Sequence, residues 1–428
     1  MTYIITFGLI SLFFLGVPIA TSLGLAGLAA YFFELGSQVN IPMIAQRMMY
    51  GINNFVLLAV PLFILSARLM NTSGITTRLF NFATTLVGFM PGGLGHANCV
   101  GSLIFAGMSG AAVADAAGLG QVEIKAMDDA GYDHEFSIAI TAASSTIGPI
   151  FPPSIPMVIY GLVGGVSVGR LFLGGVIPGI LMTGALMAMV AYYAHQRGYP
   201  RTPFPTLAGA LQASARAFLP LMTPVILLGG IWTGWFTPTE AAGVAVGYAL
   251  VLGTMIYREL GWKEVLQVFI DSARDTAALG FIVAAASFYG LLLMRTGAPA
   301  AIASALLGIS QNPLTLLLII NLILLIVGCF FETIVALLIL GPILLEVTTK
   351  VGIDPVHFGV VMVLNLMIGL LTPPFGVVLF VMQQVGGISF ERVVRATAPF
   401  IIPLIVVLAL ITVFPPLVTW LPNLAMGK

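Results

Sequence analysis

The stretch "STIGPIFPPSIPMVIYG", residues 145–161, is an apolar run that four prolines interrupt. A second stretch, "NLMIGLLTPPFGVVLF" at residues 365–380, carries a Pro-Pro pair in a similar setting. Proline has no backbone N–H to donate, and its ring clashes with the preceding turn, so it kinks or ends a helix. Both stretches therefore predict a helix that is broken in its middle. Because the two breaks have the same pattern, we look for one physical reason for both.

The composition places these helices in a membrane. Hydrophobic residues make up 59% of the 428 residues and charged residues only 7%, against roughly 25% charged residues in a soluble domain. Uncharged runs longer than the ~20 residues that cross a bilayer as a helix recur along the chain. We expect an all-α polytopic membrane protein with about ten or eleven crossings besides the broken segments. Residues 1–33 predict a first transmembrane helix, because a cleaved signal would have a basic start and a shorter apolar run.

The two proline motifs belong to an internal duplication. A shift of 221 positions lays Gly148 on Gly369, and it lays Pro152 and Pro153 on a second Pro-Pro pair. We expect a first repeat over 1–195 and a second over 220–428. The connector between them, 196–219, carries three arginines and no acid, which predicts a cytoplasmic position. An odd number of crossings in each half would turn the second repeat upside down, as in many secondary transporters.

Each repeat also contains a predicted re-entrant helical hairpin. The hairpins are expected at about 92–126 and 312–350, and the broken helices at about 136–163 and 355–386. The hairpin tips, 107–110 and 328–333, would lie near the membrane midplane beside the breaks. Helix N-termini at such tips offer N–H groups to an anion. The alternative is close helix packing through small residues.

The breaks predict cation sites. Pro152 is expected to leave the Gly148 carbonyl unpaired, and Pro373 the Gly369 carbonyl. An unsatisfied carbonyl costs several kcal/mol in hydrocarbon, and a sodium ion would satisfy it. Hydroxyl groups lie nearby at residues 144–146 and at Thr372. The alternative is that each proline only kinks its helix.

Few charges lie at membrane depth, and each is a candidate functional residue: Arg68, Asp115, Glu240, Arg295 and Glu332. Glu240 follows Pro238 and is expected either to cap a helix or to act in function. Arg68 and Arg295 hold corresponding places and are expected to pair with an acid or to meet a carboxylate substrate.

The net charge and the positions of cysteine and histidine argue against nucleic-acid binding, a disulfide and a metal site. The formal net charge is zero, so no nucleic-acid partner is expected. Cys99 and Cys329 lie in apolar sequence and are expected to be packing residues rather than a disulfide. The four histidines show no metal-ligand spacing and are expected in loops or at interfaces: His96, His134, His195 and His357.

Four segments carry a family resemblance: "FAGMSGAAVADAAGLG", "KAMDDAGYDHEFSIAITAASSTIGPIFPPSIPMVIYG", "WTGWFTPTEAAGVAV" and "GLLTPPFGVVLFV". They resemble the large membrane subunit, the M or DctM-type subunit, of tripartite ATP-independent periplasmic (TRAP) transporters. The resemblance implies a sodium-driven importer, not an enzyme, in a bacterial inner membrane. It implies a periplasmic binding protein of the P type that delivers the solute, and a small Q-type membrane subunit as a separate chain. It also implies an elevator architecture, in which a transport domain moves against a scaffold, and no cofactor beyond the coupling sodium ions.

The resemblance places one sodium ion near the first hairpin tip and break, and the other near the second. The sodium-binding residues expected on this basis are Gly107, Ser109, Ser145, Gly148, Gly328, Gly369 and Thr372. Substrate contacts are expected at Ser144, Pro152, Pro153, Glu332, Pro373 and Pro374. The solute is expected to be an acidic organic molecule, and the sequence leaves open whether it is sialic acid or a C4-dicarboxylate.

Two alternative functions remain at this stage. "GMSG" at 107–110 matches the G-x-S-G pattern of intramembrane serine proteases, which also need a membrane-embedded histidine as base. A passive channel would conduct without a binding protein or a sodium gradient.

Overall fold

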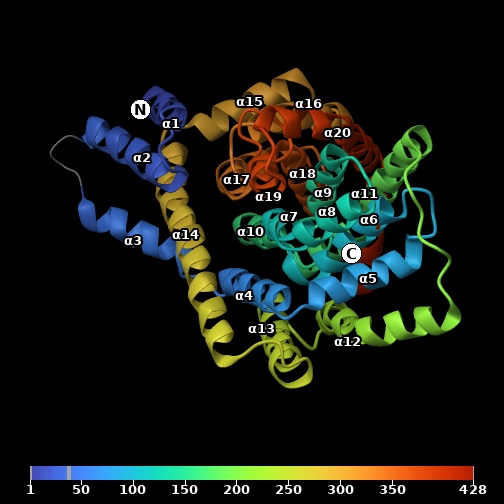
Figure 1. Cartoon of the computed structure of the whole chain (residues 1–428). Helices are drawn as coiled ribbons and strands as arrows, with labels where there is room; N and C mark the ends of the chain where they lie inside the picture. Colours follow the sequence, from blue (N-terminus) through green and yellow to red (C-terminus); the bar gives the residue numbers. More distant parts are fainter. Residues whose placement is uncertain (1, 36–39, 428) are drawn as a thin grey trace.

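The computed structural model describes residues 2–35 and 40–427, and regular structure in this part of the chain is helical throughout (Figure 1). Residues 1, 36–39 and 428, which the predicted repeats include, lie outside the described part. The chain forms a dense central bundle with a set of peripheral helices along one side. The prediction of an all-α membrane protein is confirmed.

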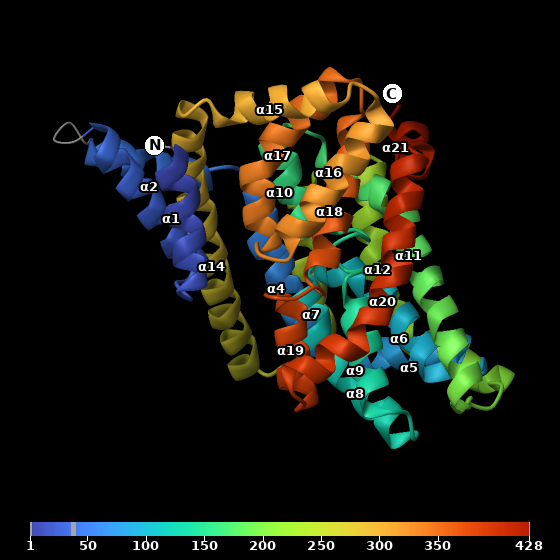
Figure 2. The same ribbon diagram turned by 90° about the horizontal axis from the view of Figure 1, so that it is seen from above.

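Residues 2–35 contain two helices. Helix α1 (Thr2–Phe14) packs against α2 (Ile19–Leu35), and α2 packs against the long helix α14 (Trp262–Arg295). Figure 2 shows this group standing beside the bundle. The predicted single transmembrane helix over 1–33 is therefore wrong. The chain turns where Gly16 adopts a φ of +75° and where Pro18 cannot donate to the preceding turn.

Further peripheral helices lie beside the bundle. Helix α4 packs against α13 and α14, and α5 packs against α12. The bounds of this group are α3 (Ile41–Ile52), the 3-10 turn η2 (Val56–Leu58), α4 (Ala59–Thr72), α5 (Ile75–Val87), α12 (Leu207–Trp232), α13 (Pro238–Leu250), its π-helical extension η3 (Val251–Ile256) and α15 (Ala298–Ile309).

The central bundle contains the two hairpins and the two broken helices. The first hairpin is α6 (Gly93–Ser109), α7 (Ala112–Ala117) and α8 (Leu119–Asp129), and the second is α16 (Pro313–Gly328) and α17 (Thr333–Lys350). The broken helices are α9 (His134–Ser145) with α10 (Ile155–Gly164), and α18 (Pro355–Gly369) with α19 (Val377–Gly386). Helices α11 (Val168–Arg197), α20 (Phe390–Val413) and α21 (Pro416–Met426) complete the bundle.

Within the described residues, six helices are long and apolar enough to cross a membrane alone, or seven spans if the bent pair α3–α4 is counted as one. The six are α11, α12, α13 with η3, α14, α17 and α20. Fewer helices than the predicted ten or eleven can thus cross alone. The rest of the apolar sequence is divided into shorter helices, because glycine and proline end them.

The two broken helices run antiparallel. Near the start of α9, His134 Nε2 lies 2.8 Å from the carbonyl oxygen of Gly386 at the end of α19. At the other end, the Tyr160 hydroxyl in α10 donates to the carbonyl of Pro355 at the start of α18, at 2.8 Å. Each broken helix therefore begins where the other ends. His134 and Pro355, the first residues of α9 and α18, are separated by the same 221 positions as the proline motifs. This antiparallel order is the one that inverted repeats would produce for these elements.

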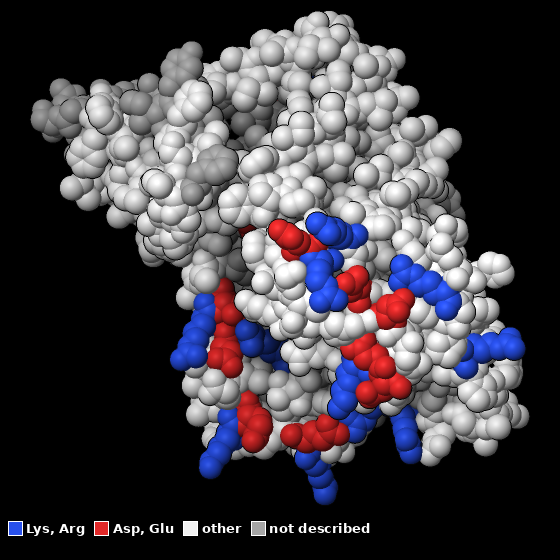
Figure 3. Space-filling model, turned by 45° about the horizontal axis from the view of Figure 1, so that its top comes forward, with Lys and Arg blue, Asp and Glu red and all other residues white. Residues whose placement is uncertain are grey.

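The first halves of the broken helices form the centre of the molecule. Every residue of α18 from Val356 to Gly369 is buried, and so is every residue of α9 from Phe136 to Ser145. A helix that is apolar on all sides is stable only where protein or lipid covers all of it. Figure 3 shows the charged side chains gathered on the lower part of one face, below a wide uncharged surface. That distribution is consistent with an apolar belt in lipid and a charged end in water.

One contact between the repeats predicts a pH dependence. The ring nitrogens of His134 lie 2.6 Å from Asp128 Oδ2 and 2.8 Å from the Gly386 carbonyl oxygen. Both partners are acceptors, so both contacts are hydrogen bonds only when the imidazole is protonated. The Gly386 carbonyl and, after it, Asp128 raise the pKa of His134 above its usual range.

A raised pKa in the folded state contributes stability that is present below the ordinary histidine pKa and is lost as pH rises through the folded value. We therefore expect the melting temperature, followed by tryptophan fluorescence in detergent, to fall over this interval in the wild type. His134→Gln should flatten that fall. The contribution of His134 to the free energy of unfolding should stay below about 1 kcal/mol, because the site is partly exposed. His195→Gln at the exposed end of α11 is the control, and an unchanged pH profile in His134→Gln would refute the assignment.

Candidate cation site at the hairpin tips and broken helices

The first hairpin tip rests on the first Pro-Pro pair. Gly110 follows α6 with a φ of +64°, and its carbonyl accepts a hydrogen bond from the Ile155 N–H at 3.2 Å. A Cβ on Gly110 would lie 2.6 Å from the carbonyl oxygen of Pro153. Glycine is required here both by the left-handed conformation and by the close approach of backbone. The tip therefore satisfies one of the N–H groups that the break exposes.

The second hairpin tip meets the second break in a similar way. The Cys329 carbonyl accepts from the Phe375 N–H at 3.2 Å, just after the Pro-Pro pair. The backbones of Gly328 and Gly369 touch, because a Cβ on Gly369 would lie 2.5 Å from the Gly328 carbonyl oxygen. Both Pro-Pro peptide bonds, at 152–153 and 373–374, are cis. The structure thus brings Gly328, Gly369 and Thr372 to one place.

The carbonyl groups at the two breaks differ from each other. The Gly148 carbonyl accepts no hydrogen bond from the described residues, as the sequence predicts. The Gly369 carbonyl accepts from the Thr372 N–H at 3.0 Å, so the prediction that it is unpaired is wrong. The difference lies in the equivalent N–H group, because at the first break the Phe151 N–H donates to the Ile147 carbonyl, at 2.9 Å, and not to that of Gly148. A carbonyl oxygen has two lone pairs, so that of Gly369 keeps one for a cation.

The hydroxyl groups at the breaks are oriented to accept. Ser145 Oγ donates to the Ala142 carbonyl at 2.8 Å, and Thr372 Oγ1 donates to the Ile368 carbonyl at 2.9 Å. A hydroxyl group has one proton, so each of these oxygens presents only lone pairs to other groups. Neutral oxygen donors of this kind suit a hard monovalent cation. Both residues therefore fit the sodium ligation that the sequence predicts.

Ser109, at the end of α6, is buried, and its hydroxyl oxygen has no hydrogen-bond partner among the described residues. It lies next to Gly110 at the first tip, where a cation would satisfy it. No described histidine hydrogen-bonds to this hydroxyl, whereas the serine protease alternative needs such a base. His357, expected near the surface, is 2% exposed, and its Nε2 contacts the Ile411 carbonyl at 2.7 Å. His96 is also buried, and both histidines lie near the start of a helix, so the loop alternative is wrong for them.

Two predicted site residues face away from the breaks. A Cβ on Gly107 would lie 2.7 Å from Cβ of Pro224 in α12, so this residue faces α12. The Ser144 hydroxyl donates to Asn98 Oδ1 at 2.6 Å and so points into the first hairpin. Their positions on helix faces account for this. Gly107 lies in the last turn of α6, and Ser144 lies next to Ser145 and therefore on a different face of α9.

Glu332 occupies the N-terminus of α17. Its Oε2 accepts hydrogen bonds from the backbone N–H groups of Ile334 at 2.9 Å and Val335 at 3.3 Å. The N–H groups expected to meet an anion at the second tip are therefore capped by this carboxylate. The proline pairs differ in exposure, since Pro152 and Pro153 are buried whereas Pro373 and Pro374 are exposed. The second break is open at the surface, and the first is closed.

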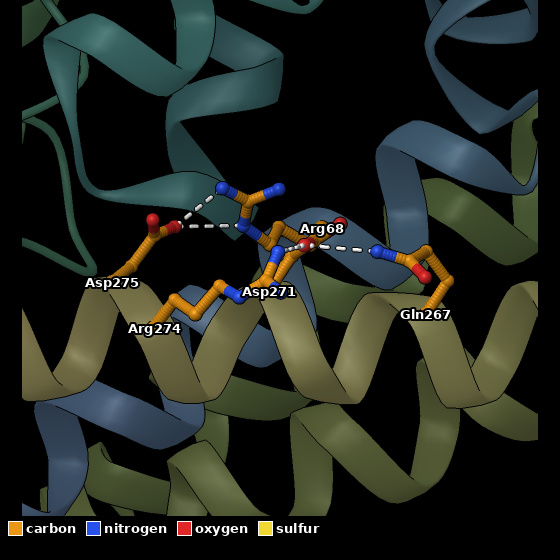
Figure 4. Close-up of polar contacts among 5 residues, drawn as sticks. All are labelled: Arg68, Gln267, Asp271, Arg274 and Asp275. Atoms are coloured by element: carbon orange, nitrogen blue, oxygen red, sulfur yellow. Dashed lines mark hydrogen bonds and ion pairs between the residues drawn. The ribbon is translucent and has the colours of Figure 1, made fainter.

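Arg68 and Glu240 make structural contacts. Arg68 in α4 binds Asp275 in α14 through Nε at 2.8 Å and Nη2 at 2.5 Å (Figure 4). This pair joins two peripheral helices. Glu240 and Thr237 form a reciprocal cap at the start of α13, which confirms the capping alternative for Glu240. Arg295 ends α14 and has no ion pair within the described residues.

Sequence reasoning missed a buried polar network beneath the first tip. Asn98 Nδ2 donates to Glu123 Oε2 and to Thr141 Oγ1, both at 2.7 Å. The available signal was Glu123 itself, a carboxyl group inside the predicted hairpin. The two cysteines are free, and Cys99 is buried beside this network.

Comparison with known proteins identifies the family. The family model "Tripartite ATP-independent periplasmic transporter, DctM component" matches residues 6–417. The chain belongs to this family. It is 48% identical to the sialic acid TRAP transporter large permease protein SiaM of Vibrio cholerae, over 98% of both chains. It is 43% identical to the sialic acid TRAP transporter permease protein SiaT of Haemophilus influenzae, over 96% of this chain and 66% of that one.

A more distant relative is the C4-dicarboxylate TRAP transporter large permease protein DctM of Vibrio cholerae, 37% identical over 98% of this chain and 96% of that one. Among solved structures, the YdaH transporter of Alcanivorax borkumensis matches 90% of both chains with a TM-score of 0.59 and 15% identity. That similarity concerns the fold alone. This TRAP transporter chain therefore shares its overall architecture with a transporter of unusual topology.

The contact between Gly328 and Gly369 is testable. Gly369→Ala places a methyl group against backbone that cannot rotate away, so the second tip and break must separate. We expect a loss of about 1–3 kcal/mol of stability, the usual cost of overpacking, measured as a lower melting temperature in detergent. Gly308→Ala on the exposed side of α15, where a Cβ meets nothing within 4 Å, is the control. A wild-type melting temperature in Gly369→Ala would contradict the described contact.

Proposed function

We propose that this chain is the sodium-coupled membrane subunit of a TRAP transporter and imports an acidic organic solute across a bacterial inner membrane. The observation that carries the proposal is the pair of contacts between hairpin tip and broken helix, one in each repeat. Each contact gathers neutral oxygens, from Ser145 and Gly148 in the first half and from Gly369 and Thr372 in the second. Secondary transporters bind coupling ions at such interrupted helices.

The solute we favour is sialic acid. Two relatives named for sialic acid transport are 48% and 43% identical to this chain, whereas a relative named for C4-dicarboxylates is 37% identical. Both solutes are carboxylates, so a positive ion at the tip would favour either. We propose that a periplasmic binding protein delivers the solute and that a small Q-type subunit stabilises the complex in the bilayer.

The proposed mechanism is an elevator movement of the hairpins and broken helices against the peripheral helices. Sodium at a tip would draw hairpin and break together and complete the solute site. Sodium and solute then raise each other's affinity by the same factor, because one coupling free energy links them.

Uptake measurements test this function directly. Proteoliposomes that contain the chain, its small subunit and its binding protein should accumulate labelled sialic acid when sodium is outside. Uptake should fall to background when potassium replaces sodium, and an excess of succinate should leave it unchanged. Undiminished uptake in potassium would end the sodium proposal. Strong competition by succinate would instead assign a C4-dicarboxylate.

A narrower test concerns the ligands. Ser145→Ala and Thr372→Ala each remove one hydroxyl that would face the ion, and a hydrogen-bonding group that meets a charge is worth about 1.5–3 kcal/mol. We expect the sodium concentration for half-maximal uptake to rise at least about tenfold in each variant. Thr349→Ala is the matched control, because Thr349 also donates to a carbonyl in its own helix, that of Leu345 at 2.7 Å, but lies exposed at the end of α17. Wild-type sodium dependence in both site variants would remove this site assignment and leave the family membership intact.

A further inference from the structure

The first hairpin encloses two carboxyl groups that the sodium sites do not use. Asp115 in α7 is 1% exposed and Glu123 in α8 is 0% exposed. Glu123 Oε2 accepts from Asn98 Nδ2 at 2.7 Å, and the Asp115 carboxyl interacts with the Ser102 hydroxyl. The other oxygens, Asp115 Oδ2 and Glu123 Oε1, have no hydrogen-bond partner among the described residues.

A chain of polar contacts joins the two groups. The Ser144 hydroxyl donates to Asn98 Oδ1 at 2.6 Å, and the Ser102 hydroxyl lies 3.1 Å from Ser144 Oγ. The network therefore runs from Glu123 through Asn98, Ser144 and Ser102 to Asp115. It draws on α6, α7, α8 and α9, which are the whole first hairpin and the first half of the broken helix.

No positive charge compensates these carboxyls within the described part of the chain. The groups that interact electrostatically with Glu123 are Asp115 and the Cys99 thiol of α6. Helix α19, which packs against α7, has no charged residue. The other charged residues of α8 and the helices around it either have partners of their own or are exposed. Arg78 pairs with Glu259, His134 with Asp128, and Glu135 with Arg392. Lys125 and Asp129 lie at the surface.

The second repeat shows that packing alone does not require these charges. Asn365 lies 221 positions after Ser144, and its amide donates to the carbonyl and Oδ1 of Asn321 in α16 at 3.0 and 3.1 Å. The Asn321 amide in turn donates to Thr412 Oγ1 at 2.9 Å. The same link between hairpin and broken helix is thus made with neutral groups. The acidic pair of the first repeat has a purpose that an amide and a hydroxyl do not fulfil.

Burial decides what the pair binds. An isolated carboxylate in an apolar interior is so costly that the group takes up a cation or a proton. Within the described residues, no group of three or more histidine, cysteine, aspartate or glutamate side chains could hold a metal ion. Glu123 Oε1 also lies close to the backbone of α6, since a Cβ on Gly101 would lie 3.1 Å from it. A metal ion needs several oxygen ligands around it, whereas a proton needs only the one oxygen. We propose that the Asp115–Glu123 pair holds one proton as its resident cation, carried by Glu123.

This proton has a mechanical consequence. With Glu123 neutral, the buried network inside the hairpin contains at most one negative charge, on Asp115. Ionisation of Glu123 would place two negative charges in the same low-dielectric space, where their repulsion is strong. Alkaline pH therefore opposes the packing of α8 on α6 and loosens the hairpin whose tip meets the first break.

Infrared spectroscopy of the purified full chain in lipid nanodiscs tests the proposal without transport or sodium. The wild type should show the carbonyl stretching band of a protonated carboxyl group at neutral pH. Glu123→Gln should remove that band. Asp115→Asn and the surface variant Glu346→Gln should retain it. Asn98→Leu removes the donor to Oε2 and should shift the band to higher frequency, which keeps the assignment testable if Glu123→Gln fails to fold.

Three results would overturn the proposal: a wild type without this band, a band that persists in Glu123→Gln, or a band lost in Asp115→Asn but not in Glu123→Gln. A second readout is the melting temperature. It should fall in the wild type as pH rises from neutral to strongly alkaline, and Glu123→Gln should abolish that component of the fall. A melting temperature that instead depends on sodium through Glu123, with no protonated band, would assign a metal cation to the pair. Failure of sodium-driven uptake bears on the proposed function alone, because neither readout uses it.

Discussion

The hydrogen bonds between hairpin tips and broken helices are the constraint on which the rest of the structure depends. A helix interrupted inside an apolar environment exposes N–H and carbonyl groups that only protein, water or an ion can satisfy. Here the carbonyls of Gly110 and Cys329 accept from Ile155 and Phe375, the first or second residue after each Pro-Pro pair. The tips are therefore held where the breaks need them, and glycine is required at Gly110 and Gly369 because backbone meets backbone there.

These contacts interlock the two repeats. The second half of each broken helix packs against the hairpin of the other repeat, α10 against α17 and α19 against α7. His134 with Gly386 and Tyr160 with Pro355 close the outer ends of the antiparallel pair. A displacement of either hairpin is thus transmitted to both breaks. The elevator movement that we propose requires such an arrangement, because hairpins and broken helices would have to move together.

The sequence predicts the broken helices and the hairpins better than it predicts their individual contacts. Proline pairs, flanking glycines and the 221-residue shift predict both breaks and both hairpins, because backbone restrictions of proline and glycine act locally. The extra hydrogen bond from Thr372 to Gly369 and the turn between α1 and α2 depend on individual backbone angles, which composition does not reveal. Side-chain direction was the least predictable feature. The Ser144 hydroxyl points into the first hairpin, and Glu332 caps α17 because a carboxylate at an N-cap satisfies N–H groups that a solute would otherwise meet.

The two halves have similar backbones, but they differ in burial and in the side chains around the breaks. In the first half the Pro-Pro pair is buried, and the polar link beneath the tip ends in two carboxyl groups. In the second half the pair is exposed, and the equivalent link, from Asn365 through Asn321 to Thr412, is neutral. Inverted repeats that were chemically identical would make both faces of a carrier equivalent. Because side chains rather than backbone carry the difference, the repeat supplies the framework for the two proposed ion sites, and the substitutions between repeats give each hairpin its own electrostatic surroundings.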